Sequence, residues 1–185
     1  MTAQTPATPA IPATMKAVVM RAPGDVVVEE VDTPRVAQPT DVVLKLAAAC
    51  VCGSDLWPYR GHNDVDHRRM GHEYVGTIVE KGEDVATLEV GDFVIGSFML
   101  SDGTCEICEA GYPSRCANAG EFTGSQAQYM RVEQADGALV PPSDGAVAAV
   151  VDGLGLGSSE PQEARPPIPI APATNTTQRI AGEAT

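Results

Sequence analysis

From Met15 to about residue 140, the chain is a series of short runs rich in valine and isoleucine, separated by glycine, proline and other turn-forming residues. Runs of this length and composition are typical of β-strands, and the residues between them supply the backbone angles that turns require. The expected strands are 15–20, 26–31, 41–49, 74–80, 92–98 and 127–132. Many short strands without long intervening helices predict a mainly β barrel or sandwich, not alternating βαβ units.

One short helix is expected within this series. Residues 53–61 could form it, with Ser54 or Asp55 as the cap at its start. Pro58 would limit its length, because proline removes a backbone donor.

Two segments differ in composition from the strand-rich region. Residues 1–14 are mostly alanine, threonine and proline, and residues 158–185 contain five prolines without apolar periodicity. Such segments cannot bury enough apolar surface to offset the entropy lost on ordering. We therefore expect a disordered leader at 1–14, one folded domain at 15–157 and a disordered proline-rich tail at 158–185.

Charge and cysteine content narrow the function classes. With 25 acidic and 12 basic residues, the chain has a formal net charge of −13, which argues against nucleic acid and membrane surfaces as partners. The N-terminal residues lack the basic and apolar regions of a secretory signal, and no run reaches the roughly 18 apolar residues of a membrane span. Five cysteines without an export signal favour a reducing compartment, where clustered thiols are usually metal ligands. A cytoplasmic location is expected.

The first group of candidate metal ligands combines one cysteine with one histidine. Cys52 is followed by Ser54 and Asp55, and His72 lies twenty residues after the cysteine. Thiolate and imidazole suit Zn²⁺, and a catalytic zinc needs three protein ligands and an open position. Asp55 could fix the tautomer of His72, and the Ser54 hydroxyl could pass a proton. A small buried thiol and a structural histidine remain the simpler alternative, because two ligands do not close a site.

The second group is denser in cysteine. Cys105 and Cys108 form a Cys-x2-Cys pair, Cys116 follows after seven residues, and Asp102 precedes the pair. Three sulfur donors and one oxygen donor at this spacing can close a tetrahedral structural zinc site. The alternative is a redox pair or three incidental thiols, but redox pairs usually sit in a helical or βαβ setting.

The histidine of the first group stands within a longer pattern of glycines and valines. The pattern runs Gly71-His72-Glu73-x-x-Gly76, then Gly82, Val85 and Val90-Gly91-Asp92-x-Val94. With Cys52-x-Ser54-Asp55 before it and the cysteine-rich segment after it, this pattern resembles the zinc-containing alcohol dehydrogenase signature of the medium-chain dehydrogenase/reductase superfamily. The resemblance covers most of Met15 to Val140.

The resemblance implies a fold and a chemistry. The fold would be a GroES-like β-barrel that holds a catalytic zinc, with Cys52 and His72 as ligands and Glu73 beside the metal. In this family zinc acts as a Lewis acid that lowers the pKa of an alcohol, and hydride then passes to NAD(P). Ser54 would relay the proton, and Asp55 would orient His72.

Two positions depart from the commonest family pattern. Asp102 stands in the structural-zinc segment where a cysteine is usual, so the occupancy of that second zinc site is open. Trp57 stands where many relatives place a histidine of the proton relay, and either His62 or water would have to replace it.

The segment after residue 150 carries the remaining expectation about the metal. Asp152, ahead of a Gly-x-Gly, resembles the position of the third catalytic ligand, although an incidental acid in a glycine-rich loop explains it as well. The same segment is not a dinucleotide-binding fingerprint, because a proline-rich tail follows it where a helix must begin. A Rossmann domain is therefore expected to be absent.

These observations favour a zinc-dependent alcohol dehydrogenase-like chain with the metal half of an active site and without the coenzyme half. Such a chain would look truncated and would turn over slowly or not at all alone. Its partners would be a small-molecule alcohol or aldehyde, and a homo-oligomer is compatible with the sequence. The alternative is a stand-alone zinc-binding or interaction module, whose exposed barrel surface would recruit another chain.

Overall fold

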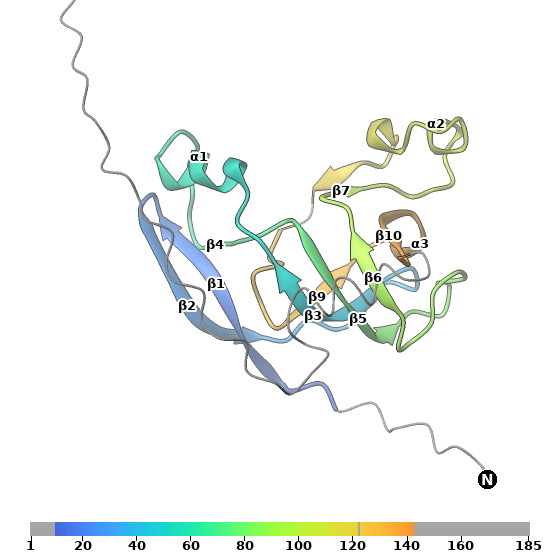
Figure 1. The fold of residues 1–185 in the computed structure, drawn as a ribbon, viewed down its shortest axis with the longest axis horizontal. Helices are drawn as coiled ribbons and strands as arrows, with labels where there is room; N and C mark the ends of the chain where they lie inside the picture. Colours follow the sequence, from blue (N-terminus) through green and yellow to red (C-terminus); the bar gives the residue numbers. More distant parts are fainter. Residues whose placement is uncertain (1–9, 122, 143–185) are drawn as a thin grey trace, which may run out of the picture. The chain divides into compact units, whose positions relative to one another are not determined.

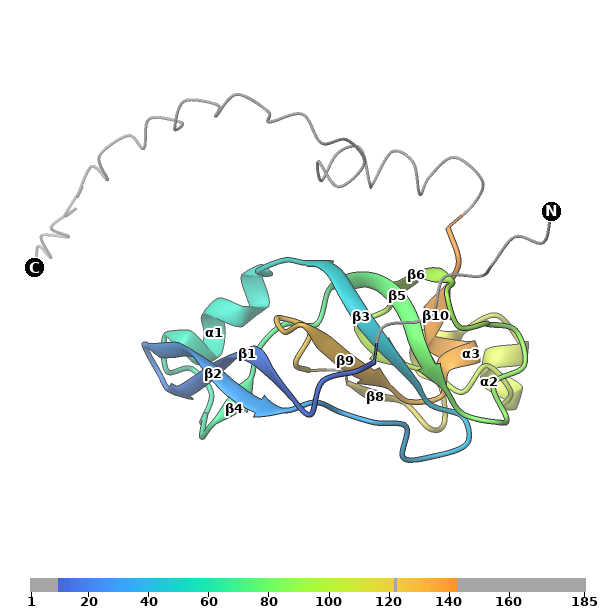
Figure 2. The ribbon, with the colours of Figure 1, turned by 90° about the horizontal axis from the view of Figure 1, so that it is seen from below.

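The computed structural model describes residues 10–121 and 123–142, whose arrangement Figures 1 and 2 show from two directions. The strands are β1 (Thr14–Ala22), β2 (Asp25–Asp32), β3 (Val42–Ala49), β4 (Arg68–Arg69), β5 (Tyr74–Lys81), β6 (Phe93–Gly96), β7 (Met99–Leu100), β8 (Gly120–Glu121), β9 (Tyr129–Val132) and β10 (Leu139–Val140). The helical turns are η1 (Gly53–Asp55), α1 (Leu56–Tyr59), α2 (Glu106–Glu109), η2 (Pro113–Arg115) and α3 (Ala135–Ala138). The segment around Asp152 and the predicted tail lie outside the described residues.

The strands form two main sheets that are joined edge to edge. One sheet has the order β10-β6-β5-β3-β9, the other β2-β1-β4, and β7 and β8 form a separate pair. An antiparallel bridge between Ala17 and Ala127 links β1 to the residues before β9. The bond from Val18 N to Gln126 O, of 2.8 Å, continues this link. All strand pairs in the described part of the chain are antiparallel, so it contains no parallel βαβ unit.

The core lies on the inner face of the five-stranded sheet. Alternation along β5 buries Tyr74, Gly76 and Ile78 and leaves the residues between them partly exposed. This period of two is what a half-buried strand requires. The apolar core cluster consists of Val42, Leu44, Tyr74, Ile78, Val85, Leu88, Val94, Leu100, Met130, Val132, Ala135, Ala138 and Leu139. The position after β5 requires a glycine, Gly82, because a Cβ there would lie 2.1 Å from the carbonyl oxygen of Pro39.

The prediction of a mainly β fold is confirmed, and each of the six expected runs contains a strand. The expected helix begins earlier than predicted: η1 starts at Gly53 with Cys52 as its N-cap, and α1 contains Pro58 at its third position. Asp55 still helps the helix start, because its Oδ2 accepts a hydrogen bond of 2.9 Å from the backbone N–H of Cys52. No helix among the described residues is long and apolar enough to cross a membrane.

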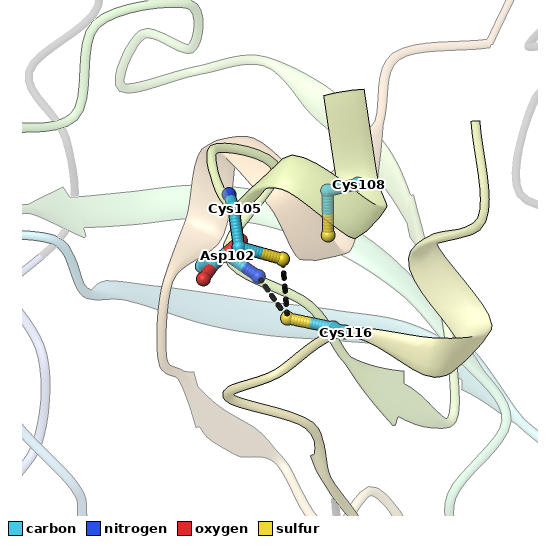
Figure 3. Close-up of side chains that lie close together, drawn as sticks. All are labelled: Asp102, Cys105, Cys108 and Cys116. Carbon is cyan, nitrogen blue, oxygen red and sulfur yellow. Dashed lines mark hydrogen bonds between the residues drawn. The ribbon is translucent and has the colours of Figure 1, made fainter. Parts of the chain in front are cut away.

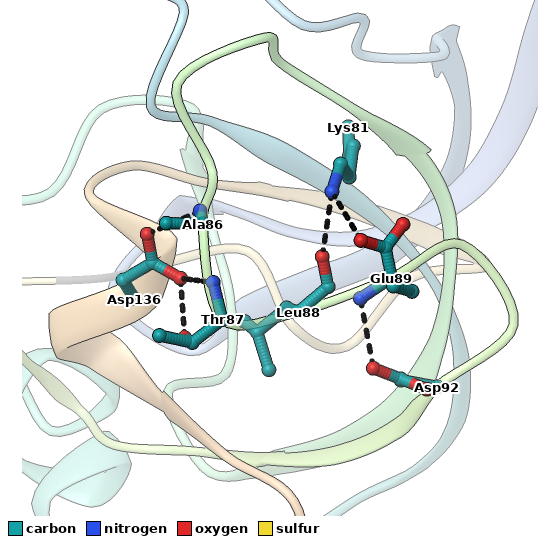
Figure 4. A network of polar contacts seen from close by, with 7 residues as sticks. All are labelled: Lys81, Ala86, Thr87, Leu88, Glu89, Asp92 and Asp136. Atoms are coloured by element: carbon teal, nitrogen blue, oxygen red, sulfur yellow. Dashed lines mark hydrogen bonds and ion pairs between the residues drawn. The ribbon is translucent and has the colours of Figure 1, made fainter.

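A carboxylate on α3 holds the loop between β5 and β6. Asp136 accepts bonds of 2.8 Å and 2.9 Å from the backbone N–H groups of Ala86 and Thr87, and a further bond from the Thr87 hydroxyl (Figure 4). This loop carries Val85 and Leu88 into the core. In Asp136→Asn, the side-chain NH₂ group would face the backbone N–H groups as a second donor. We expect the free energy of unfolding to fall by only about 1 kcal/mol, because water can reach part of the side chain. Urea unfolding, with Asp84→Asn as an exposed control in the same loop, measures this loss.

The pH dependence of that loss follows from the pKa of Asp136. Burial raises this pKa, but the bonds from Ala86 and Thr87 outweigh burial and lower it below its usual value. The stabilisation is therefore fully present above the pKa of an unfolded aspartate, about 3.9, and is lost as pH falls through the lowered native pKa. The gap between the wild type and Asp136→Asn should narrow in that acid range. A gap that stays constant from neutral pH down to this range would contradict the assignment.

Candidate metal centres

The ends of two paired strands bring the first group of candidate ligands together. β3 and β5 are antiparallel, and Ala49 pairs with Tyr74 at the end of the ladder. Cys52 follows the end of β3 by three residues, and His72 and Glu73 directly precede β5. The strand register therefore places a thiol next to an imidazole and a carboxylate, which explains why residues twenty positions apart meet.

The geometry of this cluster fits a metal ion. One ligand atom each from Cys52, His72 and Glu73 lies within 4.8 Å of the other two, and all three side chains are half-buried. Sulfur, imidazole nitrogen and carboxylate oxygen are the three donor types that Zn²⁺ takes in proteins. Glu73, expected only beside the metal, is thus near enough to be a donor itself. Asp152, the predicted third ligand, lies outside the described residues.

The imidazole of His72 is oriented by the helical turn that follows Cys52. The buried Asp55 places its Oδ1 3.5 Å from Nδ1 of His72, and Ser54 Oγ lies 3.1 Å from Nε2. A carboxylate beside Nδ1 favours the tautomer with the proton on that atom, which leaves the lone pair of Nε2 for a metal or a hydroxyl donor. The ring of Phe98 packs edge-on against the imidazole, with centroids 6.3 Å apart.

Asp55 should therefore control metal affinity without touching the metal. We expect Asp55→Asn to weaken zinc binding at this cluster by roughly 10-fold to 100-fold, the usual effect of removing a carboxylate that orients a ligating histidine. Competition with a chromophoric chelator measures the affinity. Asp66→Asn is the matched control, because Asp66 is exposed and lies beside His67, outside the cluster. Equal affinity in Asp55→Asn and the wild type would show that Asp55 only caps the turn.

Cys50 is a neighbour of this cluster that sequence reasoning missed. Its thiol donates a hydrogen bond of 2.8 Å to Oε2 of Glu73, and this bond lowers the pKa of Glu73. The same bond raises the pKa of the Cys50 thiol. The signal was present in the sequence, because residues two apart in an extended segment lie on the same side, and Cys50 stands two before Cys52.

The second group of candidate ligands also comes together. One ligand atom each from Asp102, Cys105, Cys108 and Cys116 lies within 4.8 Å of the others. The Sγ atoms of Cys105 and Cys116 are 3.9 Å apart, and in Figure 3 the three sulfur atoms point toward a common centre. The segment between β7 and β8 that carries them, with α2 and η2, is called here the cysteine lobe (residues 101–119).

Asp102 is held as a carboxylate in the cysteine lobe. Its Oδ1 accepts bonds from the backbone N–H groups of Cys105 and Thr104, and its Oδ2 accepts a bond of 2.6 Å from Asn118. The Cys105 N–H is the largest of several contributions that lower the pKa of Asp102. Asn118 is a second residue that the motif search missed. An ionised oxygen donor beside three thiols is compatible with a closed Asp-Cys₃ zinc site.

The thiols of the cysteine lobe differ in their readiness to ionise. Hydrogen bonds, first from the backbone of Ala117, lower the pKa of Cys105, whereas burial raises the pKa of Cys108 to about 12. A metal must therefore displace a firmly held proton from Cys108, because thiolate and not thiol is the ligand. Metal affinity of the lobe should accordingly fall as the pH is lowered.

Known proteins resemble this chain in sequence. Residues 38–142 match the family model described as the alcohol dehydrogenase GroES-like domain. A medium-chain reductase/dehydrogenase from Acremonium sp is 39% identical over 176 residues, which cover 83% of this chain and 60% of that protein. Zinc-type alcohol dehydrogenase B from Aspergillus flavus is 37% identical over 137 residues, which cover 71% of this chain and 32% of that protein.

A solved structure shares the fold as well. Alcohol dehydrogenase TADH from Thermus sp. ATN1 superposes with a TM-score of 0.67 at 33% identity, over 75% of this chain and 44% of that one. The chain thus spans between about a third and three fifths of the length of these proteins.

Proposed function

The chain belongs to the alcohol dehydrogenase GroES-like family, and from that membership we propose that it contributes the zinc-holding half of an NAD(P)-dependent alcohol dehydrogenase active site. The observation that carries the proposal is the convergence of Cys52, His72 and Glu73 within 4.8 Å beside an oriented serine hydroxyl. The reaction would interconvert an alcohol and an aldehyde or ketone. The relatives' names support this reaction class and leave the individual substrate open.

Each side chain of the cluster has a separate task in this proposal. Cys52, His72 and Glu73 would hold the zinc ion, which when bound supplies a Lewis acid that lowers the pKa of an alcohol. Asp55 keeps the His72 proton on Nδ1 and so presents Nε2 as the donor atom. Ser54 Oγ lies 3.1 Å from Nε2, the atom that would bind zinc, so its hydroxyl is near enough to that position to take the hydroxyl proton of a substrate and pass it on.

The cysteine lobe would have a structural task. Asp102, Cys105, Cys108 and Cys116 provide four donors and leave no position open for a substrate, which distinguishes a structural zinc site from a catalytic one. A zinc ion in the lobe would hold α2 and η2 together. Apolar packing contributes little there, because α2 contains no buried residue. We propose that this second zinc stabilises the lobe and does not take part in catalysis.

The coenzyme half is not among the described residues. Binding of NAD(P) takes a parallel βαβ unit with a helix that opens at the pyrophosphate, and the described strands pair only in the antiparallel sense. We propose that this chain alone oxidises alcohols slowly or not at all. Val51, next to Cys52, and Phe98, which packs against His72, are exposed apolar side chains, and they favour a second protein surface over the cluster.

The experiment that tests the proposed function combines metal content with activity. The purified chain, loaded with zinc, is expected to hold two zinc ions, and Cys52→Ser should lose one of them. Hydride transfer from simple alcohols to NAD⁺ or NADP⁺ should be slow with the chain alone. If Cys52→Ser retains both zinc ions, Cys52 is not a ligand and the proposed catalytic site is wrong. Fast turnover by the chain alone would contradict the proposal that it lacks a coenzyme-binding half.

A further inference from the structure

A cavity of about 220 Å³ opens directly beside the proposed zinc site, and its wall is partly basic. Ser54, Asp55, His72 and Phe98 are among the residues that line it. Arg68 and Arg69 of β4 also line it. A space of this size accommodates a molecule of a few heavy atoms, since drug-sized sites begin at roughly 300 Å³.

Arg69 lies in this wall without a carboxylate partner among the described residues. Its Nη2 donates hydrogen bonds of 3.0 Å to the carbonyl of Gly124 and 3.5 Å to that of Tyr129. Its Nε is buried and has no hydrogen-bond acceptor in the described part of the chain. Burial lowers the pKa of this guanidinium. The charge is thus partly desolvated and compensated only by carbonyl dipoles.

Arg131 is the other half-buried arginine among the described residues, and its partners differ from those of Arg69. Arg131 contacts two carboxylates, Asp41 and Glu133, as a partly buried guanidinium normally does. The chain carries 25 acidic residues, so a carboxylate partner for Arg69 was readily available to the fold. A desolvated charge without a counterion is unfavourable unless an anion from outside completes it.

The side chain of Arg69 also packs closely against the backbone at Gly124. Gly124 has a φ of +100°, and a Cβ there would lie 3.0 Å from Nε of Arg69. The guanidinium therefore rests against a backbone that only glycine leaves open. Because Arg69 packs against rigid backbone and donates to it through one nitrogen, it loses little further freedom when it binds a ligand.

We propose that Arg69, assisted by Arg68, binds an anionic group of the substrate, so that the alcohol or aldehyde handled at the zinc site carries a carboxylate or a phosphate. This inference rests on the proposed function. One cavity borders both the Ser54–His72 pair and the two arginines, so a single small molecule bound there can contact the pair with its hydroxyl and an arginine with its anionic group. An arginine fork suits both carboxylate and phosphate oxygens.

The test compares ligand pairs that differ only in charge. The zinc-loaded chain is titrated with 3-hydroxypropionate against 1-propanol, and with glycerol 3-phosphate against glycerol. Binding is followed by calorimetry and by the side-chain Nε–H resonance of Arg69 in a nitrogen–proton correlation spectrum, assigned by its disappearance in Arg69→Lys. We expect the anionic member of at least one pair to bind at least about 10-fold more tightly and to shift that resonance, because charge-assisted hydrogen bonds are the strong ones.

Variants localise the effect. Arg69→Met should abolish the preference for the anionic ligand while zinc content and the weak binding of the neutral alcohol stay as in the wild type. Arg69→Lys, which keeps the charge, should retain part of the preference. Arg35→Met is the matched control, because Arg35 lines a neighbouring cavity that Arg69 also borders and is paired with Glu80. A loss in Arg35→Met equal to that in Arg69→Met would place the anion in that other cavity and overturn the proposal.

Two further titrations distinguish a substrate anion from coenzyme phosphate, and the anion site from the zinc site. Arg69-dependent binding of NADP⁺, with no preference for the short anionic alcohols, would assign the arginine to coenzyme phosphate and would refute the substrate claim. Inorganic phosphate is titrated into the zinc-free chain as well. A shift of the Arg69 resonance in this zinc-free sample would support the anion site even if separate zinc titrations showed no binding at Cys52 and His72. Zinc binding without any anion preference would refute the anion site alone.

Discussion

The double variant Cys105→Ser/Cys108→Ser is expected to lose one of the two zinc ions and to melt at a much lower temperature than the wild type. The cysteine lobe has little else to hold it: α2 buries no residue, and of the lobe's four candidate ligands only Cys116 is buried. Loss of a structural metal belongs to the few changes that cost more than about 4 kcal/mol. Differential scanning calorimetry, together with zinc analysis of the same samples, measures both effects.

The other metal cluster provides the control for this expectation. Cys52→Ser should also lose one zinc ion, but with a small change in melting temperature, because the residues around Cys52 are anchored by the β3–β5 ladder. Adding a chelator to the wild type should reproduce the low melting temperature of the double variant. An unchanged melting temperature in the double variant would show that the lobe is held by its own hydrogen bonds and that Asp102 is only a turn residue.

The second large effect is expected at Gly71. Its φ is +92°, and a Cβ at this position would lie 2.6 Å from the backbone nitrogen of Gln126 and 2.6 Å from Oγ of Ser125. The carbonyl of Gly71 also accepts the N–H groups of Gly124 and Ser125, so the two segments cannot move apart freely. Gly71→Ala should lower the free energy of unfolding by about 3 kcal/mol or more, the sum of a strained φ and an overpacked contact. Urea unfolding measures it.

Gly91 separates the two contributions. It has a φ of +103°, yet a Cβ there would meet no atom within 4 Å. Gly91→Ala therefore carries the conformational strain alone, about 1 to 2 kcal/mol. Since Gly71 precedes His72, Gly71→Ala should weaken zinc binding at the first cluster too, whereas Gly91→Ala should not. Equal losses of stability in the two variants would mean that the contact between a Cβ at position 71 and the backbone of Gln126 does not contribute to the loss.

The strands and the metal clusters were accessible from the sequence for a common reason. Strand runs such as 74–80 carry their own period, and the cluster residues stand at fixed spacings within a recognisable pattern. The glycines of that pattern also have a physical basis in the structure, because Gly71 and Gly82 each face backbone atoms that exclude a side chain. Sequence reasoning therefore located both groups of side chains that the fold brings together.

The remaining features depend on contacts that no local pattern encodes. The two-residue strands β4, β7, β8 and β10 exist only through their partners, so their composition does not predict them. The same holds for the site: Asn118 reaches Asp102, and Arg69 reaches Gly124, across separations in the chain that only the completed fold closes. Cys50 is the exception, since its spacing from Cys52 could have placed it beside the cluster.

The proposed function depends on Cys52 and His72 binding the same metal ion. A proton–cadmium correlation spectrum of the cadmium-loaded chain tests it directly, because scalar coupling passes only through a metal–ligand bond. We predict one cadmium signal coupled to both the β-protons of Cys52 and the ring protons of His72, and a second signal coupled to the β-protons of Cys105, Cys108 and Cys116. Coupling of Cys52 and His72 to different cadmium ions, or no coupling of His72 to any, would show that the two residues do not form a shared metal site.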